Sequence, residues 1–168
     1  MNSENIMRMN TRAFSILGVV LLIGGGLFAQ SPNPKIKRIL DQAQLKYQVD
    51  KDGDFKMTFG LENERSQLVY VMSGTEEFSG EPIVEIWSPA YKGAEISQET
   101  LVQLAVDGQK RKIGGWQLTT GSETIYAVFK AKVPLAALTP EFMRAVCGGV
   151  ASVADEMEQA VMHGSDDF

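Results

Sequence analysis

One stretch of the sequence, IYAVFKAKVPLAALTPEF from Ile125 to Phe142, constrains the fold more than any other because it joins a strand to a helix. Apolar residues occupy every second position from Ile125 to Ala131, which is typical of a strand with one face on a core. Pro134 lacks a backbone donor and is expected to end that strand. Thr139 and Pro140 then fit the N-cap and the first position of a helix. The stretch therefore predicts a half-buried strand that leads directly into a helix.

The helix that starts at Thr139 is predicted to continue to about Met162. One side of it carries an apolar stripe, made of Phe142, Val146, Val150, Val153, Met157 and Val161. Gly148 and Gly149 lie mid-helix, where each costs about 1 kcal/mol relative to Ala. Together with Ala145, Ala151, Ser152 and Ala154 they form a surface of small residues. Three interpretations of it remain open: close packing against the sheet or the first helix, docking of a helix from a partner or a second copy, and a kink.

The rest of the domain is predicted to combine strands with two further helices. The first helix is expected from about Pro34 to Lys46, and the second begins after its N-cap Ser97. One strand is expected to begin at Tyr47. Further strands are expected at residues 55–61, 67–73, 82–88, 116–120 and 124–133, and a loop is expected at 75–81. The order of elements predicts an α+β fold, with an antiparallel sheet of about five to six strands and three helices.

Two local features of this arrangement can be predicted in more detail. Asp52 and Gly53 are expected to form a two-residue hairpin turn in which both residues have positive φ. The second helix is expected to turn four residues inward, Leu101, Val102, Leu104 and Ala105. Its last turn is expected to carry Lys110, Arg111 and Lys112, because positive charge suits the carboxyl end of a helix.

The first 29 residues differ from the rest of the chain. Arg8 and Arg12 precede an uncharged stretch, AFSILGVVLLIGGGLFA from Ala13 to Ala29, which is the pattern of a secretory signal and, if uncut, of an N-terminal membrane anchor. The predicted organisation is a signal peptide or anchor at 1–29, a linker at 30–34, one α+β domain at 35–163 and an acidic tail at 164–168. The protein is expected to be exported to the periplasm or beyond, or to be anchored in the envelope.

Charge and cysteine content exclude some classes of partner. The chain has 16 Lys and Arg against 21 Asp and Glu, and a net charge of −5. Nucleic acids and anionic lipid surfaces require a basic footprint, so neither is expected as a partner, and membrane contact is expected only through the N-terminal segment. The single cysteine, Cys147, cannot form an internal disulfide in an exported protein. It is expected either to be buried, which is the favoured interpretation, or to pair with another chain.

The sequence carries no recognisable catalytic or metal-binding motif. DKDGD at Asp50–Asp54 lacks the spacing of a calcium loop. His163, the only histidine, follows Cys147 by more than four helical turns, so the two cannot form a catalytic pair within one helix. Glu76–Glu77 and the group Asp155, Glu156 and Glu158 are expected to be solvated. We therefore expect no enzymatic activity, no cofactor and no metal.

Three aromatic residues are candidates for a binding surface. Trp87, Tyr91 and Trp116 lie at or near the ends of expected strands. Aromatic residues in such places either cover the rim of a core or line a peptide-binding groove, because rigid rings give contact area at little entropy cost. The candidate partner-binding residues are therefore Trp87, Tyr91, Trp116, Ala145, Gly148, Gly149 and Ser152.

The junction YAVFKAKVPLAALTPEFMRAV and the hairpin GGWQLTTGSETIYAVF resemble the YbjN-like proteins, a group labelled as bacterial sensory transduction regulators. The resemblance covers about Lys35 to Met162 and also includes the order of elements. It implies a fold similar to that of type III secretion chaperones. It further implies apolar grooves for extended or helical segments of partners, and frequent dimers. The exported N-terminus departs from this pattern, because secretion chaperones are cytoplasmic.

Three functional hypotheses follow from these observations. The first is a non-catalytic, exported binding module of the bacterial envelope that holds a protein or peptide segment, with a homodimer as one form. The alternative is an envelope enzyme or small-molecule binder whose site is assembled from Asp, Glu, Ser and Thr of distant strands. A structural subunit that works through the small residues of the last helix is a third hypothesis.

Overall fold

The structure is a computed structural model that describes residues 31–121 and 123–168. Its elements in chain order are α1 (Pro34–Gln42), β1 (Gln48–Val49), β2 (Phe55–Gly60), β3 (Ser66–Val71), β4 (Glu76–Phe78), β5 (Glu81–Gly93), α2 (Gln98–Gly108), β6 (Gly115–Thr120), β7 (Ile125–Pro134) and α3 (Pro140–Val161). The predicted export segment, residues 1–29, lies outside the described residues. Among the helices described, none is long and apolar enough to span a membrane.

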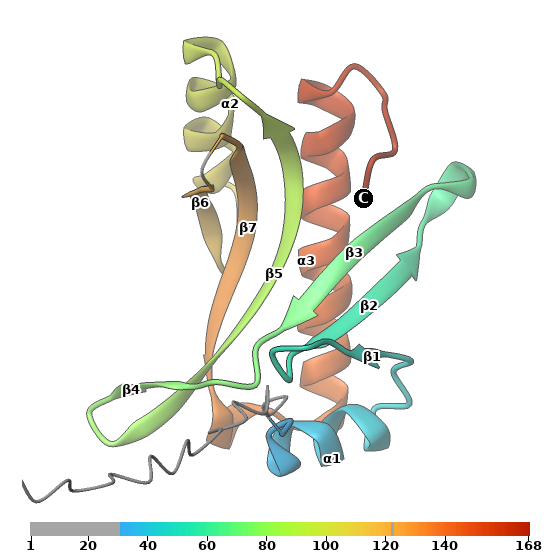
Figure 1. Ribbon diagram of the computed structural model, residues 1–168, viewed down its shortest axis with the longest axis vertical. Coiled ribbons are helices and arrows are strands. Elements are labelled where there is room, and N and C mark those ends of the chain that lie inside the picture. The colour runs from blue at the N-terminus through green and yellow to red at the C-terminus, as the bar shows by residue number, and fades with distance from the viewer. Residues whose placement is uncertain (1–30, 122) are drawn as a thin grey trace, which may run out of the picture.

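The strands form one antiparallel sheet in the order β1-β2-β3-β5-β7-β6, and β4 pairs with the start of β5. Figure 1 shows α3 running along the sheet, with α1 at the lower end of the molecule and α2 beside β6 at the upper end. The predicted α+β fold with an antiparallel sheet and three helices is confirmed. The described sheet has seven strands, because residues 75–81 form a hairpin rather than a loop. Ser79 and Gly80 supply its turn, and both have positive φ.

The alternation of side chains places one face of the sheet in the core. Val69, Ile86 and Phe129 are at most 1% exposed and pack in one cluster with residues of α3 and α1, among them Val146 and Leu40. We call the side that carries the helices the inner face of the sheet and the opposite side the outer face. The inward orientation predicted for Ala127, Phe129 and Ala131 is confirmed.

The turn between β1 and β2 is longer than predicted. The Asp50 backbone N–H donates to the Asp54 carbonyl at 2.9 Å, which leaves a loop of the three residues Lys51, Asp52 and Gly53. Only Gly53 has positive φ. The Asp50 carboxylate accepts hydrogen bonds from the N–H groups of Asp52 and Asp54, and these bonds favour the longer loop over the predicted two-residue turn.

The second helix begins as predicted, but three of the residues predicted to face inward are exposed. Ser97 Oγ accepts a hydrogen bond from the Thr100 N–H at 3.0 Å, and the helix ends at Gly108, before Lys110. Leu104 is buried, whereas Leu101, Val102 and Ala105 are exposed, so the prediction was wrong for these three. The physical reason is that α2 packs against the sheet edge at β6, and an edge covers less of a helix than a sheet face does.

Strands β3 and β5 are paired at one end and separate at the other, and we call this opening the split. Strand pairing covers Tyr70 with Trp87 and Val71 with Ile86, and next to it the Met72 N–H donates to the Glu85 carbonyl at 2.9 Å. Beyond Trp87, Pro89 has no N–H to donate, and the register of β5 shifts between Pro89 and Tyr91. Figure 1 shows the pair β2 and β3 diverging from β5 toward the upper part of the molecule.

Side chains bridge the split where backbone pairing stops. Ser88 Oγ donates to the Leu68 carbonyl at 2.6 Å. Gln67 Nε2 donates to Ser88 Oγ at 3.0 Å and to the Pro89 carbonyl at 2.5 Å. The Gln67 side chain is buried, and its Oε1 accepts no hydrogen bond from the described residues.

Candidate functional site

The structure does not bring the three predicted aromatic residues together. Trp116 lies on the inner face, where its ring packs edge-on against Phe129 at 5.2 Å and its N–H donates to the Asp107 carboxylate at 2.8 Å. Tyr91 follows the irregularity in β5 and donates its hydroxyl hydrogen to the Glu95 carbonyl. Both rings pack against the buried cluster beneath α2. For Trp116 and Tyr91 the interpretation as rim-of-core packing therefore fits the structure.

Trp87 lies apart from the other two, on the outer face of the sheet. Its ring stacks on Tyr70 of β3, with centroids 4.3 Å apart and planes inclined by 12°. The two rings meet at the backbone pair that marks the base of the split. Stacked aromatic pairs contribute about 0.5–1.5 kcal/mol beyond the area that they bury. This stack therefore stabilises the pairing of β3 with β5 at the base of the split.

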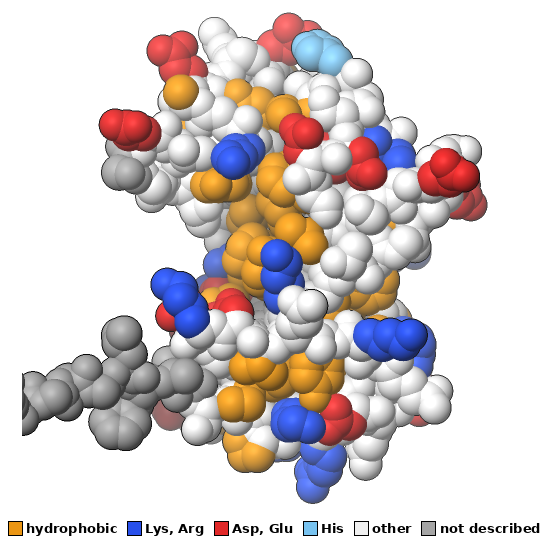
Figure 2. Space-filling model, turned by 45° about the vertical axis from the view of Figure 1, so that its right-hand side comes forward, with side chains coloured by type: hydrophobic (Ala, Val, Ile, Leu, Met, Phe, Trp, Pro, Cys, Tyr) orange, Lys and Arg blue, Asp and Glu red, His pale blue; other side chains and the backbone are white. Residues whose placement is uncertain are grey.

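A hydrophobic pocket of about 170 Å³ extends from this stack across the outer face. We call it the outer pocket, and it is lined by Leu68, Tyr70, Trp87, Pro89, Thr119, Tyr126, Val128 and Phe168. Figure 2 shows hydrophobic side chains gathered in a band down the middle of one face of the molecule, with charged side chains around it. The described helices pack on the inner side, so the wall of the pocket away from the sheet comes from the tail residue Phe168.

The open end of the split holds an ionic group, which we call the Arg65 cluster, made of Arg65, Asp155, Glu158 and Asp166. Arg65 follows the short 3-10 turn Glu62–Glu64, and its Nε lies 2.6 Å from Asp155 Oδ1. Its Nη2 lies 3.2 Å from Glu158 Oε2 and 3.7 Å from Asp166 Oδ1. Asp155 and Glu158 come from α3, so the cluster ties the start of β3 to the helix across the inner side of the split.

Burial of this cluster corrects one prediction from the sequence. Asp155 and Glu158 were expected to be solvated, but both are buried, and Glu158 is 0% exposed. Only Glu156 of that group is exposed, and it pairs with Arg111 at 2.9 Å. Burial raises the pKa of Glu158, and the Asp167 N–H and the Arg65 charge offset this only in part. The sequence contained no local signal for this, because Arg65 lies 90 residues before Asp155.

The tail residues 164–168 pack back onto the split. Arg65 Nη1 donates to the Gly164 carbonyl at 3.3 Å, and the Ser66 N–H donates to Asp166 Oδ1 at 3.3 Å. The Asp167 N–H donates to Glu158 Oε1 at 2.7 Å. Figure 1 shows the chain turning back at the upper end of α3, with its C end between β5 and β3. The predicted acidic tail is thus in contact with both the Arg65 cluster and the outer pocket.

The three carboxylates of the Arg65 cluster have one geometric property of a metal site. Asp155, Glu158 and Asp166 each offer an oxygen, and these oxygens lie within 4.8 Å of one another. The Arg65 guanidinium already contacts all three, however. A cation among them would meet this fixed positive charge. The cluster therefore suits an ion-pair network within the protein better than a metal ion.

Four of the small residues on α3, the candidate binding residues, face away from the sheet. Ala145, Gly149 and Ser152 are exposed and Gly148 is half-buried, and a Cβ at either glycine would meet nothing within 4 Å. Close packing, the first interpretation of the small residues, is therefore wrong for these four, whereas Ala151 and Ala154 are fully buried and pack in the core. α3 is also one continuous helix from Pro140 to Val161. Docking of another helix on this surface stays a prediction.

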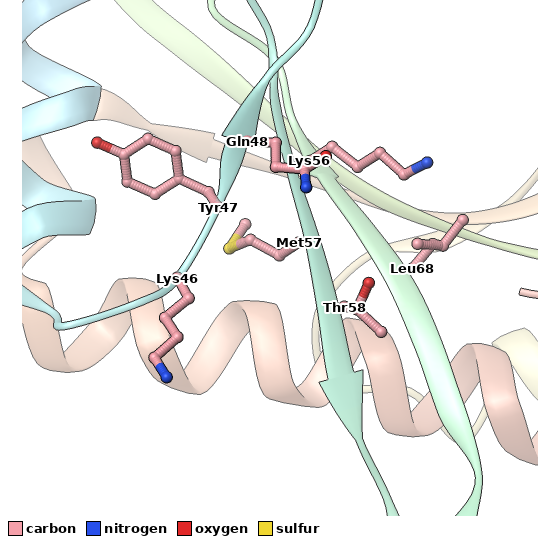
Figure 3. Close-up of a pocket in the computed structure, with 7 residues that line it drawn as sticks. All are labelled: Lys46, Tyr47, Gln48, Lys56, Met57, Thr58 and Leu68. Carbon is pink, nitrogen blue, oxygen red and sulfur yellow. The ribbon is translucent and has the colours of Figure 1, made fainter.

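Two other surfaces were not predicted from the sequence. One is an exposed hydrophobic area on α2 and β6, which we call the α2–β6 patch, formed by Leu101, Val102, Val106 and Leu118. The other is a hollow beside β1, lined by Lys46, Tyr47, Gln48, Lys56, Met57, Thr58 and Leu68. Figure 3 shows the side chains of Lys46 and Lys56 pointing away from each other, and Tyr47 pointing toward α1. The polar groups of this hollow do not converge on a common point.

Two of the remaining candidates for chemistry, Cys147 and Glu85, are inaccessible or engaged. Cys147 is buried, as predicted, and burial raises its pKa to about 12, so the thiol is unreactive at neutral pH. His163 is exposed at the end of α3. On the outer face, Glu85 lies 2.6 Å from Lys130 and 2.7 Å from Lys132. Burial works against its ionisation, but the hydrogen bonds from the two lysines outweigh it and lower the pKa of Glu85.

Comparisons with known proteins inform the fold. No protein-family model matches the chain, and no curated protein matches it in sequence. A chain of the solved structure described as "Structure of the HopA1-SchA Chaperone-Effector Complex" is similar, with a TM-score of 0.52 and 14% identity over 76% of this chain and 95% of that chain. At this identity the likeness shows the fold alone. The predicted chaperone-like fold is thereby confirmed, and the resemblance to YbjN-like proteins stays a prediction.

Proposed function

We propose that this protein is a non-catalytic module that holds a segment of another protein in the outer pocket. The observation that carries the proposal is the stack of Tyr70 on Trp87 beside a hydrophobic hollow on a sheet face that the described helices leave uncovered. Aromatic side chains in such hollows are the usual anchors of protein interfaces. The chaperone-like fold supports the same reading, although fold alone does not determine function.

The distribution of polar groups favours binding over catalysis. A catalytic site needs a nucleophile or a general acid and base within hydrogen-bond reach of one reacting atom. In the described residues the buried carboxylates Asp155 and Glu158 are paired with Arg65. The Ser88 hydroxyl donates the hydrogen bond to the Leu68 carbonyl that bridges the split. The alternative of an enzyme built on carboxylates and hydroxyls is therefore the weaker proposal.

We also propose that the protein acts in the bacterial envelope. This rests on the sequence of residues 1–29, with Arg8 and Arg12 before an uncharged apolar stretch. Cell fractionation of the full chain, followed by measurement of its intact mass, tests both export and cleavage. Recovery of the full-length mass in the cytoplasmic fraction alone would contradict it.

Selection from a random peptide library tests the binding role without knowledge of the partner. The purified full chain is used as bait, and the selected peptides are then measured against Trp87→Ala and against Leu118→Ala. The second variant is a matched control, because Leu118 is an exposed apolar residue of the α2–β6 patch. We expect the peptides to lose binding to Trp87→Ala and to keep it with Leu118→Ala. Equal binding to both variants would show that the peptides do not bind in the outer pocket.

A second copy of the chain is a further candidate partner. The α2–β6 patch supports this, because Val102 and Val106 are apolar residues of α2 that are about half exposed. Sedimentation of the full chain and of Val102→Asp distinguishes the cases. A dimer that dissociates in the variant supports association through this patch, whereas a dimer unaffected by the variant would point to another surface.

A further inference from the structure

We infer that the tail, residues 164–168, is a tethered ligand of the outer pocket, and that the pocket takes partner segments with the same chemistry, two acidic residues followed by an aromatic one. The inference rests on the proposed function, because it names what the proposed site would bind. The tail has the sequence Gly-Ser-Asp-Asp-Phe. A partner would have to displace it, so the contact is also autoinhibitory.

The aromatic end of the tail supplies the first observation. Phe168 is half-buried, although it follows four exposed residues, and it lines the outer pocket together with Trp87, Tyr126 and Val128. A residue in this place would be solvated if the tail only trailed from α3. Its ring instead covers the aromatic surface that the sheet presents, as a hot-spot residue of a partner would.

The acidic residues of the tail supply the second observation. Asp166 Oδ1 accepts a hydrogen bond from the Ser66 N–H and lies 3.7 Å from Arg65 Nη2. The start of β3 therefore offers this carboxylate both a hydrogen-bond donor and a positive charge. Lys56 adds positive charge on the same side, with Nζ 5.9 Å from the ring centroid of Tyr70. The described surface around the pocket is therefore complementary to a segment with acidic residues before an aromatic one.

The tail is held weakly enough to leave. Residues 164 to 167 are exposed, and the contacts of Asp166 are at the long end of their ranges, 3.3 and 3.7 Å. The hydrogen bond from the Asp167 N–H to Glu158 Oε1, at 2.7 Å, is shorter. A short tether nevertheless gives the tail an effective concentration on the order of millimolar. An outside segment with the same chemistry therefore binds the intact chain less tightly than a chain whose tail cannot fill the pocket.

A labelled peptide provides the test. The probe is the sequence of residues 162–168, MHGSDDF, with capped ends and a fluorophore at the amino end, and its binding is followed by anisotropy. The proteins are the full chain and its Phe168→Ala variant, which keeps every hydrogen bond of the tail. We expect the probe to bind Phe168→Ala at least about tenfold more tightly than the unaltered chain. Equal affinity for the two proteins, or no binding to either, would overturn the inference.

Two controls place the probe in the outer pocket. A probe ending in Ala instead of Phe should not bind Phe168→Ala, and the double variant Trp87→Ala with Phe168→Ala should not bind the original probe. The matched double variant Leu118→Ala with Phe168→Ala should bind it as Phe168→Ala does. Circular dichroism of each variant establishes that it is folded. Binding that persists in the Trp87→Ala double variant would show that the tail occupies a different site and would overturn the inference.

The outcomes separate this inference from the proposed function. If library peptides bind in a Trp87-dependent manner but the tail probe does not bind Phe168→Ala, the proposed function stands and the tethered-ligand inference fails. If the tail probe binds as expected but no library peptide depends on Trp87, the tail is an internal latch of the fold. In that case the inference about the tail stands as a regulatory contact and the partner-binding role fails.

Discussion

The two faces of the sheet differ in what covers them, although the same strands supply both. On the inner face, Val71, Ile86 and Phe129 are at most 1% exposed and pack against α3 and α1. On the outer face, Tyr70, Trp87 and Tyr126 are only half-buried, and within the described part of the chain Phe168 of the tail lies beside them. Neighbouring residues such as Ile86 and Trp87 of β5 therefore have different physical environments, although Val128 of the outer face is also buried.

This difference separates stability from interaction. Full burial of a large apolar side chain stabilises a fold by roughly 1.5–3 kcal/mol relative to exposure, so the inner face accounts for most of what holds the sheet and helices together. The outer face retains hydrophobic surface that the described helices do not use. Unburied aromatic surface of this kind marks an interaction site more often than chance. The predictions below test this division, from the largest expected effect to the smallest.

The largest effect is expected on the inner face. Phe129→Ala should lower the free energy of unfolding by about 3–5 kcal/mol, because it removes a fully buried ring that packs against Trp116. Tyr126→Ala, on the outer side of the same strand, should cost about 1 kcal/mol. Urea unfolding followed by circular dichroism measures both. Equal losses of unfolding free energy would contradict the proposed difference, because the two faces would then contribute alike to stability.

The next effect concerns the Arg65 cluster, which joins the open split to α3. Arg65→Ala should cost about 3 kcal/mol at neutral pH, because Asp155 and Glu158 would remain buried without their partner. The exposed Arg38 of α1 is the matched control, and Arg38→Ala should change stability by less than about 0.5 kcal/mol. A loss as small as that of the control would mean that the cluster is hydrated in solution rather than buried.

Two carboxylates should give pH dependences of opposite sign. The pKa of Glu158 is raised above its ordinary value of 4.5, so its ionisation opposes folding, and its contribution to stability falls as pH rises through the range above 4.5. The pKa of Glu85 is lowered, so its contribution is present above 4.5 and is lost as pH falls through the range below it.

Substitution by glutamine isolates each contribution. The difference in unfolding free energy between the unaltered chain and Glu158→Gln should decrease from pH 4.5 to pH 7. The corresponding difference for Glu85→Gln should decrease as the pH is lowered below 4.5, by up to about 1 kcal/mol, as for a partly exposed ion pair. The measurement is chemical unfolding at a series of pH values. Parallel curves for the two variants would contradict the assigned directions.

The smallest effect is expected on the outward side of α3. Gly149→Ala should raise the unfolding free energy by about 1 kcal/mol, because glycine disfavours a helix interior and a Cβ there meets nothing within 4 Å. Light scattering of Gly149→Leu addresses the predicted helix docking, since a bulky side chain would disrupt a close dimer. An unchanged mass would exclude a homodimer through this surface, whereas dissociation of a dimer would support it.

Much of the fold could be predicted because the signals were local. The alternation from Ile125 to Ala131, the cap at Thr139 and the cap at Ser97 each act within a few residues, and each appears in the structure. The β4 hairpin was missed because its turn residues, Ser79 and Gly80, lie beside the charged pair Glu76–Glu77, which favours a loop. In the structure Glu76 pairs with Lys132 of β7 at 2.9 Å.

The candidate site could be predicted only in part. Trp87 was named from its residue type, but its partner Tyr70 comes from another strand, and Phe168 comes from the far end of the chain. Sequence reasoning grouped Trp87 with Tyr91 and Trp116 because all are aromatic and lie near strand ends. The register shift in β5 after Pro89 puts Tyr91 with the inner face instead. Such a shift leaves no clear trace in residue pattern.

The sequence by itself determined which residues form strands and helices and which side of each is apolar, because alternation, capping and proline act through bonds and neighbours along the chain. Only the tertiary structure decided that Arg65 neutralises Asp155 and Glu158, that α2 leaves Val102 exposed, and that the tail reaches the outer pocket. These outcomes depend on which segments meet after the chain has closed loops of up to about a hundred residues. Many pairings satisfy the same local pattern, and the packing of the whole chain selects one of them.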